Sequence, residues 1–162
     1  MSPRRSGYLM RSFVHLTEEQ IAPYIKDDPV RPHLSAEFRT SGRNKAFALV
    51  ESELEGTEVL AIVCCALTFG VPTEEKDLTS KEGHEMVVSP YTVWSYKKGA
   101  GRQIIECLLR FVQQEHQEIS RSYWPRIVTL SPKTEMAELF HLRNGAIMLS
   151  SNENSNNFEY SL

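Results

Sequence analysis

The sequence predicts an α+β protein in which a mixed central sheet is flanked by helices. Residues 59–67, VLAIVCCAL, are continuously apolar and rich in β-branched residues, which is typical of a central strand covered on both faces. Residues 102–118 carry apolar side chains at helical spacing and therefore predict a long amphipathic helix. Strands and helices do not alternate strictly along the chain, which disfavours a doubly wound sheet.

The first half of the chain is predicted to hold a short helix followed by strands. Thr17 and Gln20 form a capping-box pattern at the start of this helix, and Pro23 shortens or kinks it. The turn-rich residues 27–33 then predict a loop. A strand at 46–52, a turn at Gly56, the central strand at 59–67 and a polar loop at 70–83 complete this half.

A strand, a glycine turn and the long helix follow one another in the second half. The strand is expected at 85–94, where Pro90 indicates a bulge or a splayed edge. Gly99 and Gly101 frame a tight turn directly before the helix. The sequence therefore places a glycine-rich turn at the junction of a sheet strand and a helix N-terminus.

The C-terminal elements are a strand, a helix and two further strands. The short strand is expected at 126–131. The helix is expected at 132–144, with Ser131 as its N-cap, Pro132 in its first turn and Gly145 at its end. Two strands, at 146–150 and 156–162, and the Asn-rich turn between them end the chain.

Length and composition indicate one globular domain, residues 1–162, with 41% hydrophobic and 24% charged residues. The net charge of −3 disfavours nucleic acid as a partner. The longest apolar run is too short to span a membrane, and the basic N-terminus lacks the apolar segment of a signal peptide. Cys64, Cys65 and Cys107 have neither disulfide-like nor zinc-like spacing, so we expect buried thiols, no metal and a cytoplasmic location.

The glycine turn is the first candidate site. Free amides at a helix N-terminus, together with the positive end of the helix dipole, attract anions. Lys97, Lys98 and Arg102 add positive charges around Gly99, Ala100 and Gly101. The turn has neither a GK[ST] nor a G-x-G-x-x-G signature, so a plain turn with solvated lysines is the alternative.

This arrangement resembles the acyl-CoA-binding half of the GCN5-related N-acetyltransferases (GNAT), which have an acyl-CoA N-acyltransferase fold. In that family a [QR]-x-x-G-x-[GA] turn holds the CoA pyrophosphate. Gly99 and Gly101 match its glycines, whereas Tyr96 stands where Gln or Arg is usual. The resemblance implies acetyl-CoA as cofactor, bound by residues 98–102. It also implies that backbone amides of Val93, Trp94 and Ser95 hold the pantetheine arm and thioester, which the Trp94 ring could cover.

The segment FHLRNGA, residues 140–146, is the second candidate site. It is similar to the fY-x-k-x-GF segment of the same family, with Phe140 on the aromatic position and Gly145 on the glycine. His141 falls on the tyrosine that often protonates the departing CoA thiolate, and Ala146 replaces the final aromatic residue. An imidazole can donate a proton near neutral pH. The resemblance therefore implies that His141 is catalytic.

The segments VTLSP, FHLRNGA and NFEYSL are also similar to the C-terminal part of malonyl-CoA decarboxylases, a divergent branch of this fold. Ser131 and His141 match the catalytic serine and histidine of that family. The chain lacks the long helical domain of those enzymes. Without either resemblance, Ser131 is a helix N-cap and His141 a hydrogen-bonded structural histidine.

Further polar residues are weaker candidates. Glu85 precedes the strand that carries the general base in many acetyltransferases, although carboxylates beside strands are usually solvated. Arg39 and Arg43 are placed to receive an anionic acceptor, with solvated surface charge as the alternative reading.

The leading hypothesis is an acetyl-CoA-dependent N-acyltransferase that acts on an unknown amine, either a small molecule or a protein. The alternatives are a malonyl-CoA decarboxylase-like enzyme and a non-catalytic protein that binds a host protein through the same fold. Small bacteriophage acetyltransferase-like proteins match the chain in size, which implies a viral or bacterial origin and, if viral, the host cytoplasm. An oligomer is compatible with all of these hypotheses.

Overall fold

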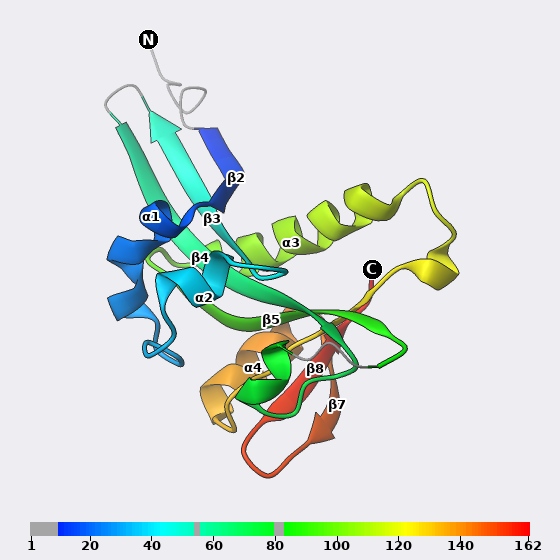
Figure 1. The fold of residues 1–162 in the computed structure, drawn as a ribbon. Coiled ribbons are helices and arrows are strands. Elements are labelled where there is room, and N and C mark those ends of the chain that lie inside the picture. Colours follow the sequence, from blue (N-terminus) through cyan, green and yellow to red (C-terminus); the bar gives the residue numbers. More distant parts are fainter. Residues whose placement is uncertain (1–9, 54–55, 80–82) are drawn as a thin grey trace.

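The computed structural model describes residues 10–53, 56–79 and 83–162, and in these residues seven strands form one sheet (Figure 1). The strands are β2 (Met10–Leu16), β3 (Lys45–Glu53), β4 (Gly56–Phe69), β5 (Met86–Ser95), β6 (Arg126–Val128), β7 (Ile147–Ser151) and β8 (Asn156–Tyr160). Their order across the sheet is β2-β3-β4-β5-β6-β8-β7. Only β5 and β6 are parallel, so the sheet is mixed and the predicted α+β class is confirmed.

Helices cover both faces of this sheet. The α-helices are α1 (Glu18–Ile21), α2 (Ala36–Thr40), α3 (Ala100–His116) and α4 (Glu135–Arg143), and the 3₁₀ helices are η1 (Ala22–Asp27), η2 (Glu75–Thr79) and η3 (Arg121–Tyr123). Helices α1 and α2 lie on one face, and α3 lies on the other (Figure 1). Within the described residues, no helix is both long enough and apolar enough to cross a membrane.

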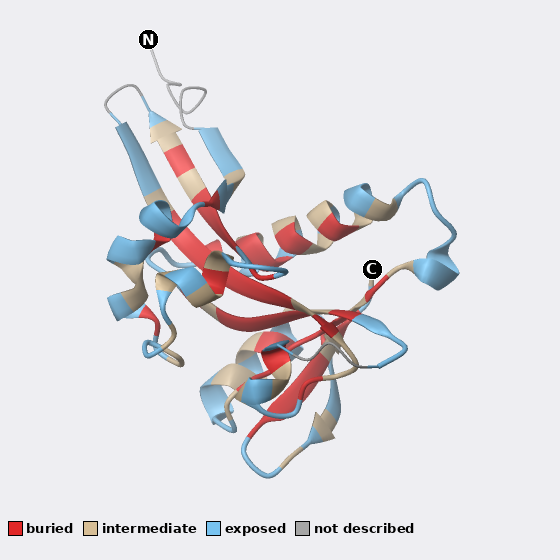
Figure 2. Cartoon of the chain, in the orientation of Figure 1, coloured by how far each residue is buried: buried red, intermediate tan, exposed pale blue. Residues whose placement is uncertain are grey.

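The sheet separates two apolar cores, because alternate residues of a strand point to opposite faces. In β3, Phe47 and Leu49 pack toward α3, whereas Ala46 and Ala48 pack toward α1 and α2. Strand β4 contributes to both cores and is buried over most of its length, as the run VLAIVCCAL predicts (Figure 2). Ile104, Ile105 and Leu108 form the buried stripe of α3.

Most predicted elements are present. The capping box of Thr17 and Gln20 is formed, and the α-helix gives way to a 3₁₀ helix at Ala22, one residue before Pro23. Strand β2 and helix α2 were not predicted. Strand β2 has no strict alternation of apolar residues and gains its order by pairing with β3, while α2 has only five residues.

The parallel pair β5 and β6 separates beyond its first residues. The two strands pair only at Val87–Arg126 and Val88–Ile127, and the last contact is a 3.4 Å hydrogen bond from the Leu130 amide to the Pro90 carbonyl. A register shift in the pairing of β4 with β5 at this level confirms the bulge predicted from Pro90. From Tyr91 onward, no strand of the described residues pairs with the edge of β5 that faces β6.

The predicted cap of the last helix is wrong. The N-cap of α4 is Thr134, whose side chain accepts a hydrogen bond from the Ala137 amide. Ser131 lies three residues earlier in an isolated bridge with Asn156, and Pro132 precedes the helix. Gly145, with φ of 96°, follows the end of the helix as predicted.

We expect Thr134→Ala to lower the free energy of unfolding by about 1 kcal/mol, because the variant loses the side chain that caps the N-terminus of α4. Urea unfolding monitored by circular dichroism measures this change. Thr134→Ser is the control and should retain the wild-type stability. Equal unfolding midpoints for the alanine and wild-type proteins would contradict the assignment of Thr134 as the cap.

Candidate functional site

Three segments that the sequence singled out meet on the α3 face of the sheet. A Cβ atom built on Gly101, in the first turn of α3, would lie 3.1 Å from the Phe140 ring of α4 and 3.8 Å from the Ser95 hydroxyl of β5. The structure therefore brings the end of β5, the start of α3 and the segment FHLRNGA together. It also explains Gly101, since a larger side chain would press on Phe140.

The N-terminus of α3 has the features of an anion site. Gly99 is its N-cap, with φ of 84°, a left-handed conformation that favours glycine. No side chain of the described residues caps this helix. Its first amides therefore remain available to a bound anion, and the helix dipole adds a partial positive charge.

The basic residues around this turn differ in whether they form ion pairs. Lys97 is 3.5 Å from Glu51, a carboxylate that also pairs with Arg11 at 2.8 Å. Lys98 and Arg102 are exposed and form no ion pair with the described residues. Of the predicted basic contacts, Lys98 and Arg102 are thus the two whose charges are free for a ligand.

Val93, Trp94 and Ser95 lie on the free edge of β5, beyond the point where β6 separates. Val93 packs toward α3, whereas the Trp94 side chain is buried in the opposite core with Tyr91. The Trp94 indole donates a 2.9 Å hydrogen bond to the Tyr96 hydroxyl, which donates to Asp27 at 2.7 Å. The Trp94 ring therefore does not support a role in covering an arm bound on the α3 face. Because Tyr96 pairs with Leu60 of β4, the Trp94 amide points toward β4, and the amides of Val93 and Ser95 point toward the free edge.

His141 is buried and held on several sides. Its Nδ1 atom shares a 2.8 Å hydrogen bond with the Tyr160 hydroxyl of β8, and its ring stacks on Phe158 at a centroid distance of 5.2 Å. Burial lowers the pKa of His141 from 6.5 to about 4. The ring is therefore neutral at pH 7 and resists protonation, which fits hydrogen bonding better than donation from an imidazolium.

Ser131 is buried beside polar groups rather than at a helix end. Its hydroxyl lies 2.8 Å from the Thr129 hydroxyl, and its backbone forms two 2.9 Å hydrogen bonds with Asn156. The Asn156 side-chain oxygen is buried and has no hydrogen-bond partner among the described residues. No hydrogen bond joins Ser131 to His141.

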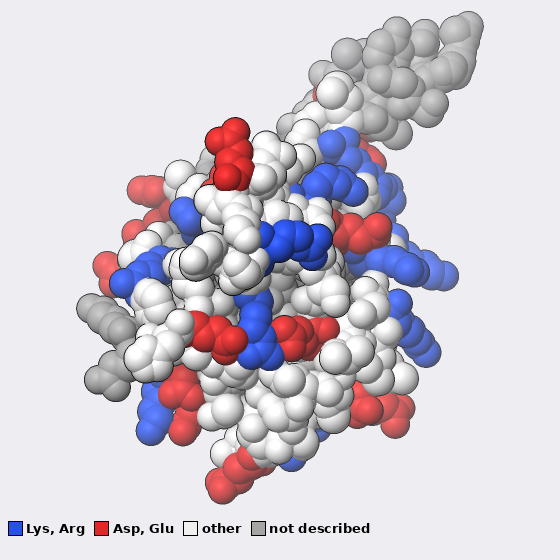
Figure 3. Space-filling model, turned by 90° about the vertical axis from the view of Figure 1, so that its right-hand side faces the viewer, with Lys and Arg blue, Asp and Glu red and all other residues white. Residues whose placement is uncertain are grey.

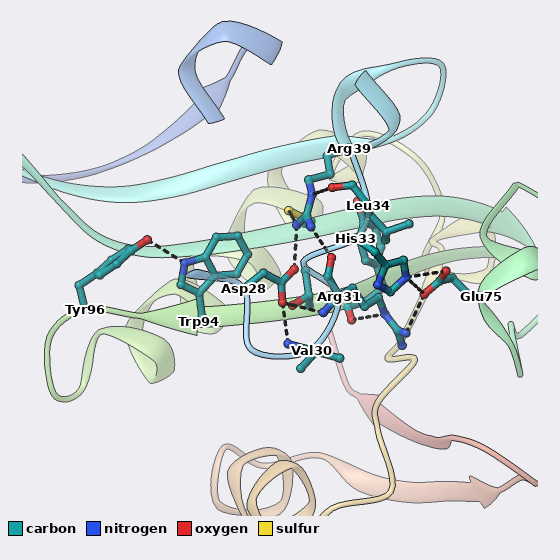
Figure 4. Close-up of polar contacts among 12 residues, drawn as sticks. Asp28, Val30, Arg31, His33, Leu34, Arg39, Glu75, Trp94 and Tyr96 are labelled. Carbon is teal, nitrogen blue, oxygen red and sulfur yellow. Dashed lines mark hydrogen bonds and ion pairs between the residues drawn. The ribbon is translucent and has the colours of Figure 1, made fainter. Parts of the chain in front are cut away.

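On the opposite face of the sheet, Arg31 bridges β5 and the segment that follows β6 (Figure 4). Its Nε donates to the Tyr91 carbonyl of β5 at 3.1 Å, and its Nη2 donates to the Leu130 carbonyl at 2.9 Å. Its Nη1 contacts Glu75 at 3.2 Å, and Glu75 lies 2.9 Å from His33. The guanidinium satisfies strand carbonyls that a regular parallel ladder would pair, and so sets the spacing of the strands.

Arg31 is positioned by a buried ion pair. Arg39 and Asp28 have fully buried side chains 2.8 Å apart, and Arg39 also donates to the Arg31 carbonyl. Burial alone would raise the pKa of the Asp28 carboxyl, but hydrogen bonds from the Arg31 and Val30 amides, and from Thr92 and Arg39, lower it. Asp28 is therefore a carboxylate that ties the loop after η1 to β5.

The structure bears on three weaker predictions. Arg39 is neither a surface charge nor an anion receptor, because it is buried against Asp28. Arg43 lies over the Phe69 ring at 4.7 Å from its centroid. Glu85 pairs with Arg126 at 3.0 Å and precedes β5, so about 30 Å of extended strand separates it from Ser95. This distance does not support Glu85 as the general base.

The network around Arg31 was not found from the sequence. The segment DDPVRPH signals a turn, but nothing in it indicates that Asp28 is buried or that Arg31 reaches β5. A small open cavity of about 250 Å³ lies elsewhere, between η3 and the end of β8. Arg121, Trp124, Arg126, Glu159 and Tyr160 are among its lining residues, and none of the predicted site residues lines it. No cluster of metal-ligating side chains occurs within the described residues.

Solved structures share this fold, although no protein-family model and no curated protein matches the sequence. AtaTR bound with acetyl-CoA is similar with a TM-score of 0.63 at 14% identity, over 93% of this chain and 92% of that chain. NAA60 of Arabidopsis thaliana in complex with acetyl-CoA is similar with a TM-score of 0.62 at 15% identity, over 93% and 98%. The chain therefore has the predicted fold of the GCN5-related N-acetyltransferases.

The second predicted resemblance also has a structural counterpart. Malonyl-CoA decarboxylase from Agrobacterium vitis is similar with a TM-score of 0.57 at 18% identity, over 86% of this chain. The match covers 37% of that chain, so this protein corresponds to little more than a third of the decarboxylase.

We expect Arg39→Met to lower the free energy of unfolding by about 3–5 kcal/mol, because it leaves the Asp28 carboxylate buried without its partner. The double variant Asp28→Asn with Arg39→Met should recover part of this loss, since no unpaired charge remains. Urea unfolding of both proteins measures the difference. A double variant less stable than the single one would contradict the pairing.

His141 should make the protein less stable as the pH falls below 6.5. The unfolded chain binds a proton at this residue near pH 6.5, whereas the folded chain resists protonation down to about pH 4. The stability from the neutral ring is thus fully present above pH 6.5. It is lost progressively toward pH 4, by about 3 kcal/mol in total.

Urea unfolding between pH 7 and pH 4.5 tests this expectation in the wild type, in His141→Gln and in the exposed-site control His84→Gln. The control should follow the wild type, and His141→Gln should lose less stability on acidification. Parallel curves for all three proteins would show that His141 titrates normally.

Proposed function

We propose that this protein is an acetyl-CoA-dependent N-acetyltransferase whose single domain, residues 1–162, transfers an acetyl group to an amine. The convergence of the β5 edge, the uncapped N-terminus of α3 and the segment FHLRNGA carries this proposal. The similar folds of AtaTR and NAA60, both in complex with acetyl-CoA, support it.

The residues on the α3 face fit an acyl-CoA. The amides after Gly99, with the charges of Lys98 and Arg102, suit the pyrophosphate, and Gly99, Ala100 and Gly101 let it approach the backbone. The free edge of β5, with the outward-facing amides of Val93 and Ser95 on either side of Trp94, suits the pantetheine arm and the thioester carbonyl. Amides aimed at that carbonyl would stabilise the negative charge that develops when the amine attacks.

His141 is the proposed catalytic residue on α4. Because its ring is neutral at pH 7 and linked to Tyr160, it would take part in proton transfer as a relay with the tyrosine hydroxyl. In this scheme the attacking amine loses a proton and the CoA thiolate gains one. Ser131 is proposed to contact the acyl group, because it is buried in a bridge with Asn156 and does not cap α4.

The second candidate function is decarboxylation of malonyl-CoA. The observation that favours it is the position of Ser131, which is buried and does not cap α4. The similarity to a malonyl-CoA decarboxylase over a part of that enzyme also supports it. Without a Ser131–His141 hydrogen bond, we rank this function below acetyl transfer.

The acceptor amine and the compartment stay at the level of expectation. We propose a small molecule or a protein as acceptor, and the absence of a nucleic-acid acceptor remains a prediction from the net charge of −3. The three cysteines are free thiols, which supports a reducing compartment such as the cytoplasm. The proposed bacteriophage origin rests on size alone.

We expect the purified protein to bind acetyl-CoA and the double variant Lys98→Glu with Arg102→Glu to bind it at least about tenfold more weakly, because two free positive charges at the anion site are reversed. Isothermal titration calorimetry with acetyl-CoA measures both affinities. The matched control is Arg110→Glu, which reverses an exposed charge far along the same helix and should bind like the wild type.

Turnover separates the two candidate functions. An amine panel with acetyl-CoA should release CoA in the wild type and much less in His141→Gln. Carbon dioxide release from malonyl-CoA without an amine would instead favour the decarboxylase. A wild-type protein that binds no acetyl-CoA would overturn the proposal.

A further inference from the structure

Exposed apolar side chains gather on one segment at the C-terminal end of the sheet. The described residues carry eleven large hydrophobic side chains that are exposed, and six of them lie on α4 and β7. They are Met136 (82% exposed), Leu139 (39%), Leu142 (42%), Ile147 (65%), Met148 (42%) and Leu149 (39%). Apolar patches of this kind on a folded protein mark interaction surfaces.

The patch includes an open edge of the sheet. Strand β7 is the last strand of the sheet, so its outer edge pairs with no strand of the described chain. It carries no charge and no proline, the features by which proteins usually protect an edge. At the other end of the described sheet, β2 carries Arg11, which is bound to Glu51. Figure 3 likewise shows a largely uncharged area at the height of β7.

We propose that α4 and β7 form an interface with a second copy of this chain, related by a two-fold axis, in which the two β7 edges meet antiparallel. The unpaired backbone groups of one β7 then find the matching groups of the other. Because a bulge at Leu149 interrupts the pairing of β7 with β8, the ladder is short and apolar side chains supply most of the contact. This inference is independent of the proposed function.

The charges on α4 are complementary to those on α4 of a second copy. Its first turn carries Glu135 and Glu138, and its last turn carries Arg143. None of these side chains forms an ion pair within the described residues. Helix α4 packs beside β7, so two copies whose β7 edges run antiparallel also bring their α4 helices antiparallel. The acidic turn of one copy then faces the basic turn of the other.

Sedimentation velocity of the full chain across micromolar concentrations tests the proposal. The wild type should sediment as a dimer with twice the chain mass of 18.5 kDa. Leu149→Lys and Met136→Lys should raise the dimer dissociation constant by about thirtyfold or more. Ile119→Lys and Tyr123→Lys replace exposed apolar residues elsewhere and should leave the dimer intact.

A charge exchange tests the antiparallel arrangement. Glu138→Lys and Arg143→Glu should each weaken the dimer, and the double variant should restore it, because the opposite charges again face each other across the two-fold axis. Circular dichroism spectra show whether each variant is folded. Because Arg143 is exposed and Glu138 is only half-buried, this series stays informative if Leu149→Lys does not fold.

A monomeric wild type at all concentrations would overturn the proposal. So would a dimer unchanged by Leu149→Lys, Met136→Lys and the single charge variants. A wild type that forms the dimer but does not bind acetyl-CoA would support this proposal and would contradict only the proposed function.

Discussion

The separation of β5 from β6 is the constraint on which the arrangement of this protein depends. A parallel pair that continued past Pro90 would bury the backbone edge of Val93 to Ser95 in a ladder and leave no room for a ligand. The bulge at Pro90 starts the separation, and the guanidinium of Arg31 maintains it by bonding the Tyr91 and Leu130 carbonyls. Strand carbonyls that would otherwise be costly to leave unpaired are thus satisfied by a side chain.

The two faces of the sheet contribute in different ways. The face that carries α3 provides an open strand edge, helix amides and the free charges of Lys98 and Arg102, all of which suit an anionic ligand. The opposite face provides rigidity, because the buried Asp28–Arg39 pair holds the loop that delivers Arg31 (Figure 4). A buried ion pair is weak evidence for stability, but it fixes the geometry of the groups that it joins.

The segment FHLRNGA combines packing with the chemical role that we propose for His141. Phe140 closes against Gly101, and His141 is locked between Phe158 and Tyr160. This packing sets the protonation of the ring, because burial without a nearby carboxylate disfavours the imidazolium. The histidine that the sequence presents as a proton donor is therefore a neutral group in the folded protein, which changes its expected part in catalysis.

Local patterns were sufficient for the α+β class, the central strand, the helix after Gly99 and the bulge at Pro90, because periodicity, β-branching and the backbone limits of glycine and proline act over a few residues. They were also sufficient to single out the glycine turn and His141. The burial of Arg39, the position of Arg31 and the true cap at Thr134 depended on the folded chain. These features arise from contacts between residues far apart in sequence. The local sequence of a turn is the same whether its charged side chain lies in solvent or between two segments of the sheet.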